Sequence, residues 1–368
     1  MRWYLEAPLK DIREQKCYAS QDNRVFRSFS NIVNRAELFA PGSTHIAVGF
    51  VDLGSLCEAE LAPAGGSSLP LRWIGYEASA YICAKTLVVA AMVSAAGAAA
   101  AAGAAAAAVD DVIDVWYSTS WRRRVNLAFK AAAASLLSGI ADDFGPAQRH
   151  PGVAALLQHW SEAEDVPLAA ARAEWLAGVH TDDWTLIGGF TKAEDRQALC
   201  RYALTGQLPL GAEDAEGGED AEVGSVAMFS LPPGFVAAAR AGGESFLRAV
   251  APQRLYSARA LTSDIVAAGV LHLRERIGQM AARMRSGAVA VSVRLQAVRP
   301  GDAHVHAEIA ALRPTSISWG GLCDHFQPAE FHAMARACST SLSPEETVHH
   351  ACSTKWPQLT MGASVLDV

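Results

Sequence analysis

Two short apolar runs mark the start of the segment that reads as a folded core. Residues 45–56, HIAVGFVDLGSL, lead into a glycine-containing turn, and residues 71–76, LRWIGY, follow a loop rich in Gly, Ser and Pro. Runs of this length with β-branched and aromatic residues are typical of buried strands. Residues 79–93 then repeat apolar positions at helical spacing, at Ile82, Thr86, Val89 and Val93. The pattern predicts two strands followed by a helix.

Helix and strand patterns alternate along much of the remaining chain. Helices are predicted over residues 125–140, 192–204, 263–284 and 329–338, with a helical hairpin around Pro167. Strands are predicted over residues 287–298, over a short segment ending near Trp319, over the late segment 347–356 and at residues 224–229. Residues 112–121 are either a strand or the end of a helix, and their β-branched and aromatic content leans towards a strand. Residues 304–312 fit either type. This alternation is typical of an α/β fold with a largely parallel sheet.

Shifts in composition suggest where the chain divides. Residues 1–44 are charged and polar with scattered apolar positions, and we expect an N-terminal helical leader there. Residues 211–223 contain an acidic, glycine-rich run that is expected to be a disordered loop. This loop would separate the first half of the core with its helical insertion, residues 45–210, from the second half and a C-terminal extension, residues 224–368.

The net charge of the chain argues against nucleic acid as a partner. The chain has 368 residues, a formal net charge of −7 and a hydrophobic fraction of 51%. Its length is ample for a sizeable core. A mildly acidic balance argues against bulk electrostatic binding of nucleic acid.

The N-terminal and alanine-rich segments indicate in which cellular compartment the protein is expected. Residues 1–20 carry charges where a secretory signal needs an apolar stretch. Residues 86–109 are long enough on paper to span a membrane, but they are mostly Ala and Gly, which contribute little transfer free energy. The 7 cysteines are scattered, and without a C-x-x-C pair they fit a reducing compartment. We therefore expect a cytoplasmic protein without a membrane segment.

Glu77 ends the second apolar run. Nucleoside ligands commonly bind at the carboxyl edge of a parallel sheet, so this position is a candidate for ligand binding. Gly49 and Gly54 lie in the turn after the first run, with Asp52 between them. A nucleotide-binding turn needs glycine so that the backbone can pass close to the ligand. An acid roughly 20 residues further on can accept hydrogen bonds from ribose hydroxyls. The dense G-x-G-x-x-G fingerprint is missing, so two alternatives stay open: a nucleoside pocket at Glu77, or a fold of this shape without the ligand.

Histidines and cysteines gather near the C-terminus, at Cys323, His325, His332, Cys338, His349, His350 and Cys352. Imidazole and thiolate are ligands that zinc prefers, but this spacing matches no usual zinc site, and no metal is expected. The alternatives are a satisfied structural role and an acid–base or substrate-facing histidine. Two charged groups upstream are interpreted as helix starts: the acids Asp110, Asp111 and Asp114, and the basic run at residues 122–124.

The order of strand, glycine turn, strand, GYEAS and helix resembles the start of a class I S-adenosylmethionine-dependent methyltransferase. Residues 315–331, TSISWGGLCDHFQPAEF, are similar to the later strand of such enzymes, where a Ser-Asn or similar pair lines the cofactor pocket. More narrowly, the chain resembles an uncharacterised eukaryotic family whose Rossmann-like domain occurs beside MYND zinc fingers and in axonemal dynein assembly factors. The resemblance covers residues 45–93 and 312–356. It implies a Rossmann-like fold, with helices on both faces of a mostly parallel sheet, plus a helical insertion.

The same resemblance implies S-adenosylmethionine as cofactor, faced by Gly49, Asp52, Gly54, Glu77, Trp319, Gly320 and Asp324. Gly320 and Gly321 stand where the Ser-Asn pair would be expected, and the MYND finger is absent. Two functions follow as hypotheses. One is a methyltransferase-like protein that binds S-adenosylmethionine and transfers a methyl group to an acceptor that the sequence does not identify. The other is a non-catalytic protein-interaction or assembly scaffold on a degenerate methyltransferase fold, with a protein partner.

Overall fold

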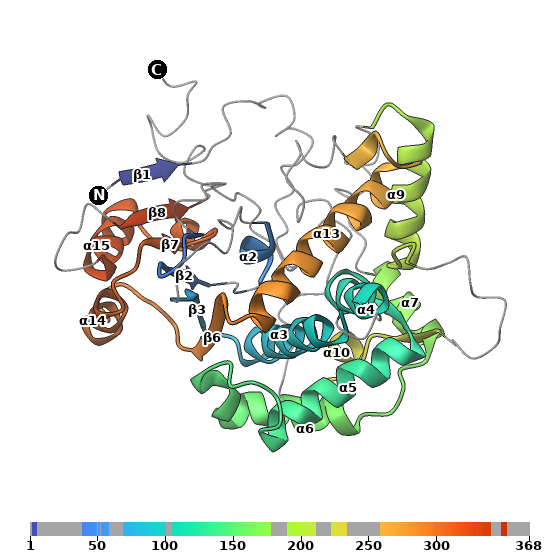
Figure 1. Ribbon diagram of the computed structural model, residues 1–368, viewed down its shortest axis with the longest axis horizontal. Coiled ribbons are helices and arrows are strands. Elements are labelled where there is room, and N and C mark those ends of the chain that lie inside the picture. The colour runs from blue at the N-terminus through green and yellow to red at the C-terminus, as the bar shows by residue number, and fades with distance from the viewer. Residues whose placement is uncertain are drawn as a thin grey trace.

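The computed structural model describes residues 2–5, 39–49, 51, 53–58, 69–100, 105–177, 190–210, 222–233, 258–339 and 347–351. In these residues the fold is α/β and Rossmann-like, with a parallel sheet between helices on both of its faces (Figure 1). A helical insertion extends the fold to one side of the sheet.

The main sheet is 6-stranded, and all of its neighbouring pairs are parallel. Its strands are β1 (Arg2–Leu5), β2 (Thr44–Val48), β3 (Leu71–Glu77), β6 (Val289–Leu295), β7 (Ser316–Ser318) and β8 (Val348–Ala351). Their spatial order is β1-β8-β7-β2-β3-β6. The chain thus runs outward from β2 through β3 to β6 and then returns to the other side of β2 with β7 and β8. The boundary between β2 and β7 is the topological switch point at which doubly wound folds bind ligands.

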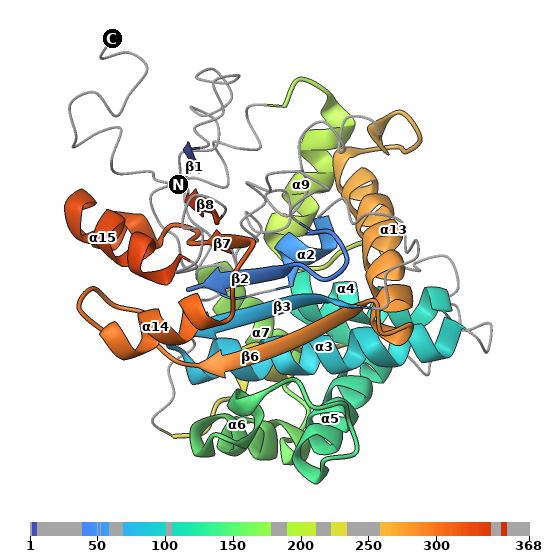
Figure 2. The ribbon, with the colours of Figure 1, turned by 60° about the vertical axis from the view of Figure 1, so that its left-hand side comes forward.

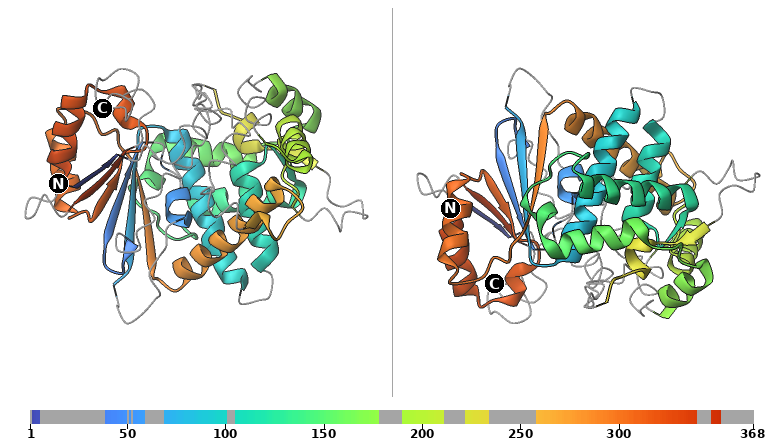
Figure 3. Two further views of the ribbon diagram at one scale, coloured as in Figure 1. Left: turned by 90° about the horizontal axis from the view of Figure 1, so that it is seen from above. Right: turned by 90° about the horizontal axis from the view of Figure 1, so that it is seen from below.

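The helices belong to two layers and an insertion. They are α2 (Gly54–Glu58), α3 (Ala80–Ala100), α4 (Ala105–Tyr117), α5 (Arg123–Ser138), α6 (Pro151–Glu162), α7 (Leu168–Ala177), α9 (Ala193–Thr205), α10 (Val226–Phe229), α13 (Ile265–Arg285), α14 (Ala303–Ala311) and α15 (Pro328–Cys338). Figure 3 shows α14 and α15 on one face of the sheet and the remaining helices on the other side.

Neighbouring residues of the central strands enter different apolar cores. Ala47 and Trp73 belong to the core that contains α3 and α13, whereas Ile46 and Ile74 belong to the core that contains α14 and α15. A parallel sheet covered on both faces has near-continuous apolar strands. This explains why the strand sequences show runs of apolar residues and not strict alternation.

The insertion lies in the crossover from β3 to β6. It contains the helices from α4 to α10 and an antiparallel ribbon of β4 (Ser120–Arg122) and β5 (Glu222–Gly224). In Figure 2, α3 runs between the sheet and helices α5 and α6, and α13 packs against α3, α4 and α9. The two helices therefore connect the sheet to the polar network described below.

Helix α3 is the central helix of the described residues. It packs against α4, α5, α6 and α13, and Arg285 Nη1 of α13 donates to Gly97 O at 2.8 Å. Residues 80–99 are long and apolar enough to cross a membrane, and 78% of the apolar window is buried within the fold. A helix that is apolar on all sides is also typical of a large core. Its length and composition are therefore weak support for a membrane span.

Most of the predicted elements are confirmed. The helices predicted over residues 125–140, 192–204, 263–284 and 329–338 correspond to α5, α9, α13 and α15. The hairpin around Pro167 corresponds to α6 and α7, and the strands predicted from residues 45, 71 and 287 correspond to β2, β3 and β6. The segment that fitted either type, residues 304–312, is helix α14.

Two predictions within the insertion are wrong. Residues 112–117 are the last turns of α4, so the lean towards a strand is wrong and the helix-end alternative is right; Val109, Val112, Ile113 and Trp116 recur at helical spacing and are all buried. Residues 226–229 form the short helix α10 and not a strand. In both places packing of an apolar helical face outweighs β-propensity.

The predicted ends of two segments also change. Residues 2–5 form strand β1 and not part of a helical leader, because β8 provides a parallel partner for all four positions. The remainder of the predicted leader up to residue 38 lies outside the described residues. Residues 222 and 223, at the end of the expected disordered loop, belong to β5, and residues 211–221 lie outside the described part of the chain.

Candidate functional site

The two strands expected to flank a ligand are parallel neighbours, with Val48 of β2 opposite Tyr76 of β3. The chain leaves β2 at Gly49, whose φ of 70° is a left-handed conformation that glycine adopts without strain. Gly49 N donates to Tyr76 O at 2.9 Å, so the ladder continues one residue past the strand. The glycine turn and the end of β3 therefore lie at the same edge of the sheet.

Glu77 points inward at this edge. The residue is 5% exposed. Its Oε2 accepts a hydrogen bond from Val51 N at 3.1 Å, and its Oε1 accepts one from Ser79 N at 2.8 Å. A buried carboxylate requires donors for its oxygens, and here the backbone of the two strand-end loops provides them. Glu77 therefore fastens the loop after β2 to the start of α3.

Two described residues of the loop after β2 turn their apolar side chains into the core. Val51 and Leu53 are each 1% exposed. A Cβ at Gly75 would collide with Val51 Cγ1, so glycine at this strand position makes room for the valine. Thr86 Oγ1 of α3 donates to Val51 O at 2.7 Å. The backbone donor and acceptor of Val51 are thus both used, and its side chain occupies space next to the sheet.

The switch point between β2 and β7 is approached by the 3₁₀ turn η3 (Leu322–His325). A Cβ on Gly49 would lie 3.7 Å from Leu322 Cδ1, which is ordinary packing distance. Trp319, which follows β7, is 0% exposed; its indole lies nearly parallel to the His349 ring, with centroids 6.2 Å apart, and meets Phe331 edge to face. The indole therefore fills the core of α15, whereas Val51 fills the core on the opposite face.

The structure places the predicted cofactor residues at three strand ends. Gly49 and Gly54 follow β2, Glu77 ends β3, and Trp319, Gly320 and Asp324 follow β7. Because β7, β2 and β3 are successive neighbours, these residues share one edge of the sheet. Gly54 and Gly320 are buried and Asp324 is partly exposed, while Asp52 lies outside the described residues. Their role towards a cofactor stays a prediction.

His349 is the centre of a buried polar chain. Trp319 Nε1 donates to His349 Nδ1 at 3.0 Å, and His349 Nε2 lies 2.9 Å from Ser339 Oγ. Because an indole can only donate, Nδ1 must be the unprotonated nitrogen and Nε2 carries the hydrogen. Ser339 Oγ in turn donates to Ala335 O at 3.2 Å. Burial, followed by the charges of His350 and the N-terminus, lowers the pKa of His349 to about 3, so the ring is neutral.

The C-terminal histidines and cysteines do not converge on one point. Cys323 and Cys338 are 0% exposed and belong to no disulfide, and His325 is exposed. Cys352 lies outside the described residues. Among the residues that are described, no group of 3 or more His, Cys, Asp and Glu side chains could hold a metal ion. For His349, the hydrogen-bond chain favours the structural alternative.

A second buried histidine, His45, links β2 to β7. Its Nδ1 lies 2.6 Å from Ser316 Oγ, and its ring lies against Phe39 with centroids 4.8 Å apart. His45 Nε2 is buried and has no hydrogen-bond partner among the described residues. Burial, with a smaller effect from His350, lowers the pKa of His45 to about 3. Sequence reasoning missed this residue, and a polar residue inside an otherwise apolar strand was the available signal.

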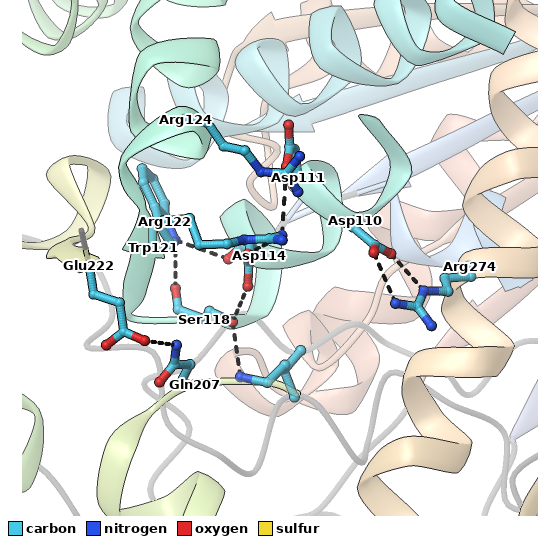
Figure 4. A network of polar contacts seen from close by, with 11 residues as sticks. Asp110, Asp111, Asp114, Ser118, Trp121, Arg122, Arg124, Gln207, Glu222 and Arg274 are labelled. Carbon is cyan, nitrogen blue, oxygen red and sulfur yellow. Dashed lines mark hydrogen bonds and ion pairs between the residues drawn. The ribbon is translucent and has the colours of Figure 1, made fainter. Parts of the chain in front are cut away.

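A polar network in the insertion was also missed (Figure 4). Asp110, Asp111 and Asp114 of α4 pair with Arg274, Arg124 and Arg122, respectively. The interpretation of these acids as the first turn of a helix is therefore wrong, because they lie in the middle of α4. The basic run does begin a helix, α5, but Arg122 is paired and largely buried and not solvated. Asp110 and Asp114 are 8% and 3% exposed. The signal was present as acids on one helix followed closely by a run of arginines.

Comparison with family models, with curated proteins and with solved structures finds no match to this chain. The site is therefore interpreted from its own geometry.

Proposed function

We propose that this chain is a non-catalytic protein-interaction or assembly scaffold on a degenerate, methyltransferase-like Rossmann fold. The use made of Glu77 is the observation that carries this proposal. Its two carboxylate oxygens accept the backbone amides of Val51 and Ser79. An acid that binds ribose must present its oxygens to sugar hydroxyls, whereas this acid is enclosed with 5% of its surface exposed.

The loop after β2 supports the same function. In a nucleotide-binding turn, glycine lets the backbone approach the ligand. Here Val51 stands two residues after Gly49, its amide is directed at Glu77, and its side chain packs over Gly75. Leu53 is buried behind it. The residues as arranged therefore do not fit an adenosine group unless Val51 leaves its position.

Binding of S-adenosylmethionine, with methyl transfer to an unidentified acceptor, is the second candidate function. It is favoured by the strand order and by a left-handed glycine after β2 beside an acid at the end of β3. Doubly wound folds bind nucleoside ligands with this arrangement. For binding, the loop would have to release Glu77 from Val51. Hydrogen bonds to charged groups contribute about 1.5–3 kcal/mol each, so this opening opposes binding.

Ligand titration separates the two candidates. S-adenosylmethionine and its demethylated product are titrated into the full chain by calorimetry and by thermal unfolding. A scaffold gives no saturable heat and no thermal shift. A cofactor site stabilises the fold by RT ln(1 + [L]/Kd), about 2.7 kcal/mol at a ligand excess of 100 over Kd.

A matched pair of variants sharpens the result. Glu77→Gln changes the candidate carboxylate, whereas Glu308→Gln changes one on α14 that meets Tyr76 and Arg294. If the proposal holds, Glu77→Gln lowers the stability of the fold. Neither variant then responds to the ligand, just as the wild type does not. Saturable stabilisation of the wild type that is lost in Glu77→Gln and kept in Glu308→Gln would overturn the proposal and establish the second candidate. The scaffold also predicts that the tagged chain elutes from native extract in an assembly larger than itself, and elution as a single chain would count against it.

A further inference from the structure

One arginine is shared between two carboxylates at the corner between α4 and β4 (Figure 4). Arg122 Nη2 lies 3.0 Å from Asp114 Oδ2 and 3.7 Å from Asp111 Oδ1. Arg122 Nε is buried and has no hydrogen-bond partner in the described part of the chain. The guanidinium is therefore not fully satisfied where it lies, and a small rotation would bring it closer to Asp111.

Asp114 connects this arginine to two other segments. Its Oδ1 accepts from Ser118 Oγ at 2.8 Å, and Ser118 Oγ accepts from Leu208 N at 3.3 Å. Its backbone oxygen accepts from Trp121 Nε1 at 3.0 Å. The last turn of α4, strand β4 and the segment after α9 therefore meet at this one carboxylate.

The charge of Asp114 is finely balanced. Burial raises the pKa of Asp114 to about 7, against the opposing effects of Arg122 and of the Ser118 hydrogen bond, and the nearby charge of Asp111 adds to the increase. The carboxyl group therefore gains or loses its proton near neutral pH. An ionised carboxylate holds a guanidinium by a charge-assisted hydrogen bond, whereas a protonated one loses the ion pair.

The other charged groups around the corner have partners of their own. Asp110 accepts two hydrogen bonds from Arg274 of α13, at 2.6 and 2.9 Å. Arg124 of α5 lies 3.1 Å from Asp111. On β5, Glu222 accepts from Arg172 of α7 and from Gln207. Within the described residues, Arg122 is thus the cation that faces Asp114 directly.

We propose that Asp111, Asp114 and Arg122 form a proton-operated latch at the α4–β4 corner. When Asp114 is ionised, Arg122 pairs with it and holds β4 against the end of α4. When Asp114 takes a proton from solvent, Arg122 turns to Asp111, and the carboxyl group stays buried as a neutral hydrogen-bonding group. Because Arg122 is opposite Glu222 in the β4–β5 ribbon, the latch sets how firmly the whole ribbon is held. This inference is independent of the proposed scaffold function.

Carboxyl-carbon NMR on the full chain with ¹³C-labelled aspartate tests the latch from about pH 5 to about pH 9. One aspartate should titrate with a midpoint near 7, and its signal should be absent from Asp114→Asn. Protection from hydrogen exchange at residues 118–122 and 208, corrected for intrinsic rates, should rise below that midpoint by up to roughly tenfold per pH unit, because opening the corner exposes Asp114 and returns its pKa towards the ordinary value. Asp114→Asn, which is permanently uncharged, should show protection that does not change across this midpoint.

Asp110→Asn is the matched control, because it removes an acid of the same helix whose arginine partner lies on α13. It should keep both the titration and the pH-dependent protection. Asp111→Asn should lower the midpoint, since Asp111 contributes to the raised value. The proposal is overturned if every aspartate of the wild type titrates below about pH 5, or if Asp114→Asn keeps pH-dependent protection. The wild-type titration tests the proposal even if a variant does not fold.

Discussion

Two buried neutral histidines should make the native state sensitive to acid. The pKa of His45 and of His349 is lowered from 6.5 to about 3 in the folded chain, mainly by burial. Between these two values the unfolded chain binds a proton at each site and the native chain does not, so stability falls as pH falls. Each proton contributes about 1.4 kcal/mol per pH unit. The pair should therefore weaken the native state by about 2.7 kcal/mol for each unit below about pH 6.5.

Asp114 acts in the opposite direction over almost the same window. Its pKa is raised from 3.8 to about 7, so between these values the native chain holds a proton that the unfolded chain has lost. Stability from this group therefore falls as pH rises, by about 1.4 kcal/mol per unit. Together the three groups predict a net loss of about 1.4 kcal/mol per unit on acidification from about pH 6 to about pH 4.5. His332, whose pKa burial also lowers, adds to the loss with the same sign.

Urea unfolding at several pH values within this window measures the slope directly. In His349→Gln the contribution of His349 to the loss of stability in acid disappears. The side-chain oxygen of Gln can still accept a hydrogen bond from Trp319 Nε1. The acid slope of this variant should fall by about 1.4 kcal/mol per unit, whereas in Asp114→Asn it should rise by the same amount. His325→Gln, at an exposed position, should behave as the wild type. An unchanged slope in His349→Gln would refute the assignment of His349 as a neutral buried ring.

Three further substitutions test the contacts of the sheet edge, each by urea unfolding at neutral pH. Glu77→Gln turns an NH₂ group towards a backbone donor and should lower the free energy of unfolding by about 1–3 kcal/mol; a change of only a few tenths would mean that the carboxylate is solvated. Trp319→Phe removes the donor to His349 Nδ1 and should lower that free energy by a similar 1–3 kcal/mol, roughly, with a shifted Nδ1 resonance as the spectroscopic check. Gly75→Ala places a Cβ against Val51 Cγ1 and should destabilise by about 1–3 kcal/mol; a neutral effect would show that the loop is free to move.

Long periodic elements could be predicted from the sequence because their signals are local. Helix α13 begins where Asp264 accepts from Ala267 N at 2.8 Å, and α5 ends at Gly139 with φ of 70°. Both boundaries are set by residues next to the helix. Strands β1 and β4 could not be predicted in the same way. They have 4 and 3 residues and depend on the partners β8 and β5 that lie far away in the sequence.

The features of the candidate site also divide into local ones, which the sequence predicts, and ones that depend on distant residues. The sequence located Gly49 and Glu77, because a glycine turn and an acid at a strand end are local features. It could not show that Val51 N would point at Glu77, since that direction depends on the missing Cβ of Gly75 and on the hydroxyl of Thr86. The arginine partners in the insertion were hidden for the same reason. Asp110 and Arg274 are 164 residues apart.

An acid at the end of the second strand is therefore ambiguous for a physical reason. A buried carboxylate must receive hydrogen bonds in any functional state, and sugar hydroxyls or backbone amides can both provide them. When the residue two positions after the turn glycine is apolar, as Val51 is, burying its side chain pulls its amide towards the acid, and the acid is satisfied without a ligand. A Rossmann fold can in this way bury an acid such as Glu77 on backbone amides alone. The informative residue for a ligand at such an edge is thus the one two positions after the glycine, because its side chain decides which way its amide points.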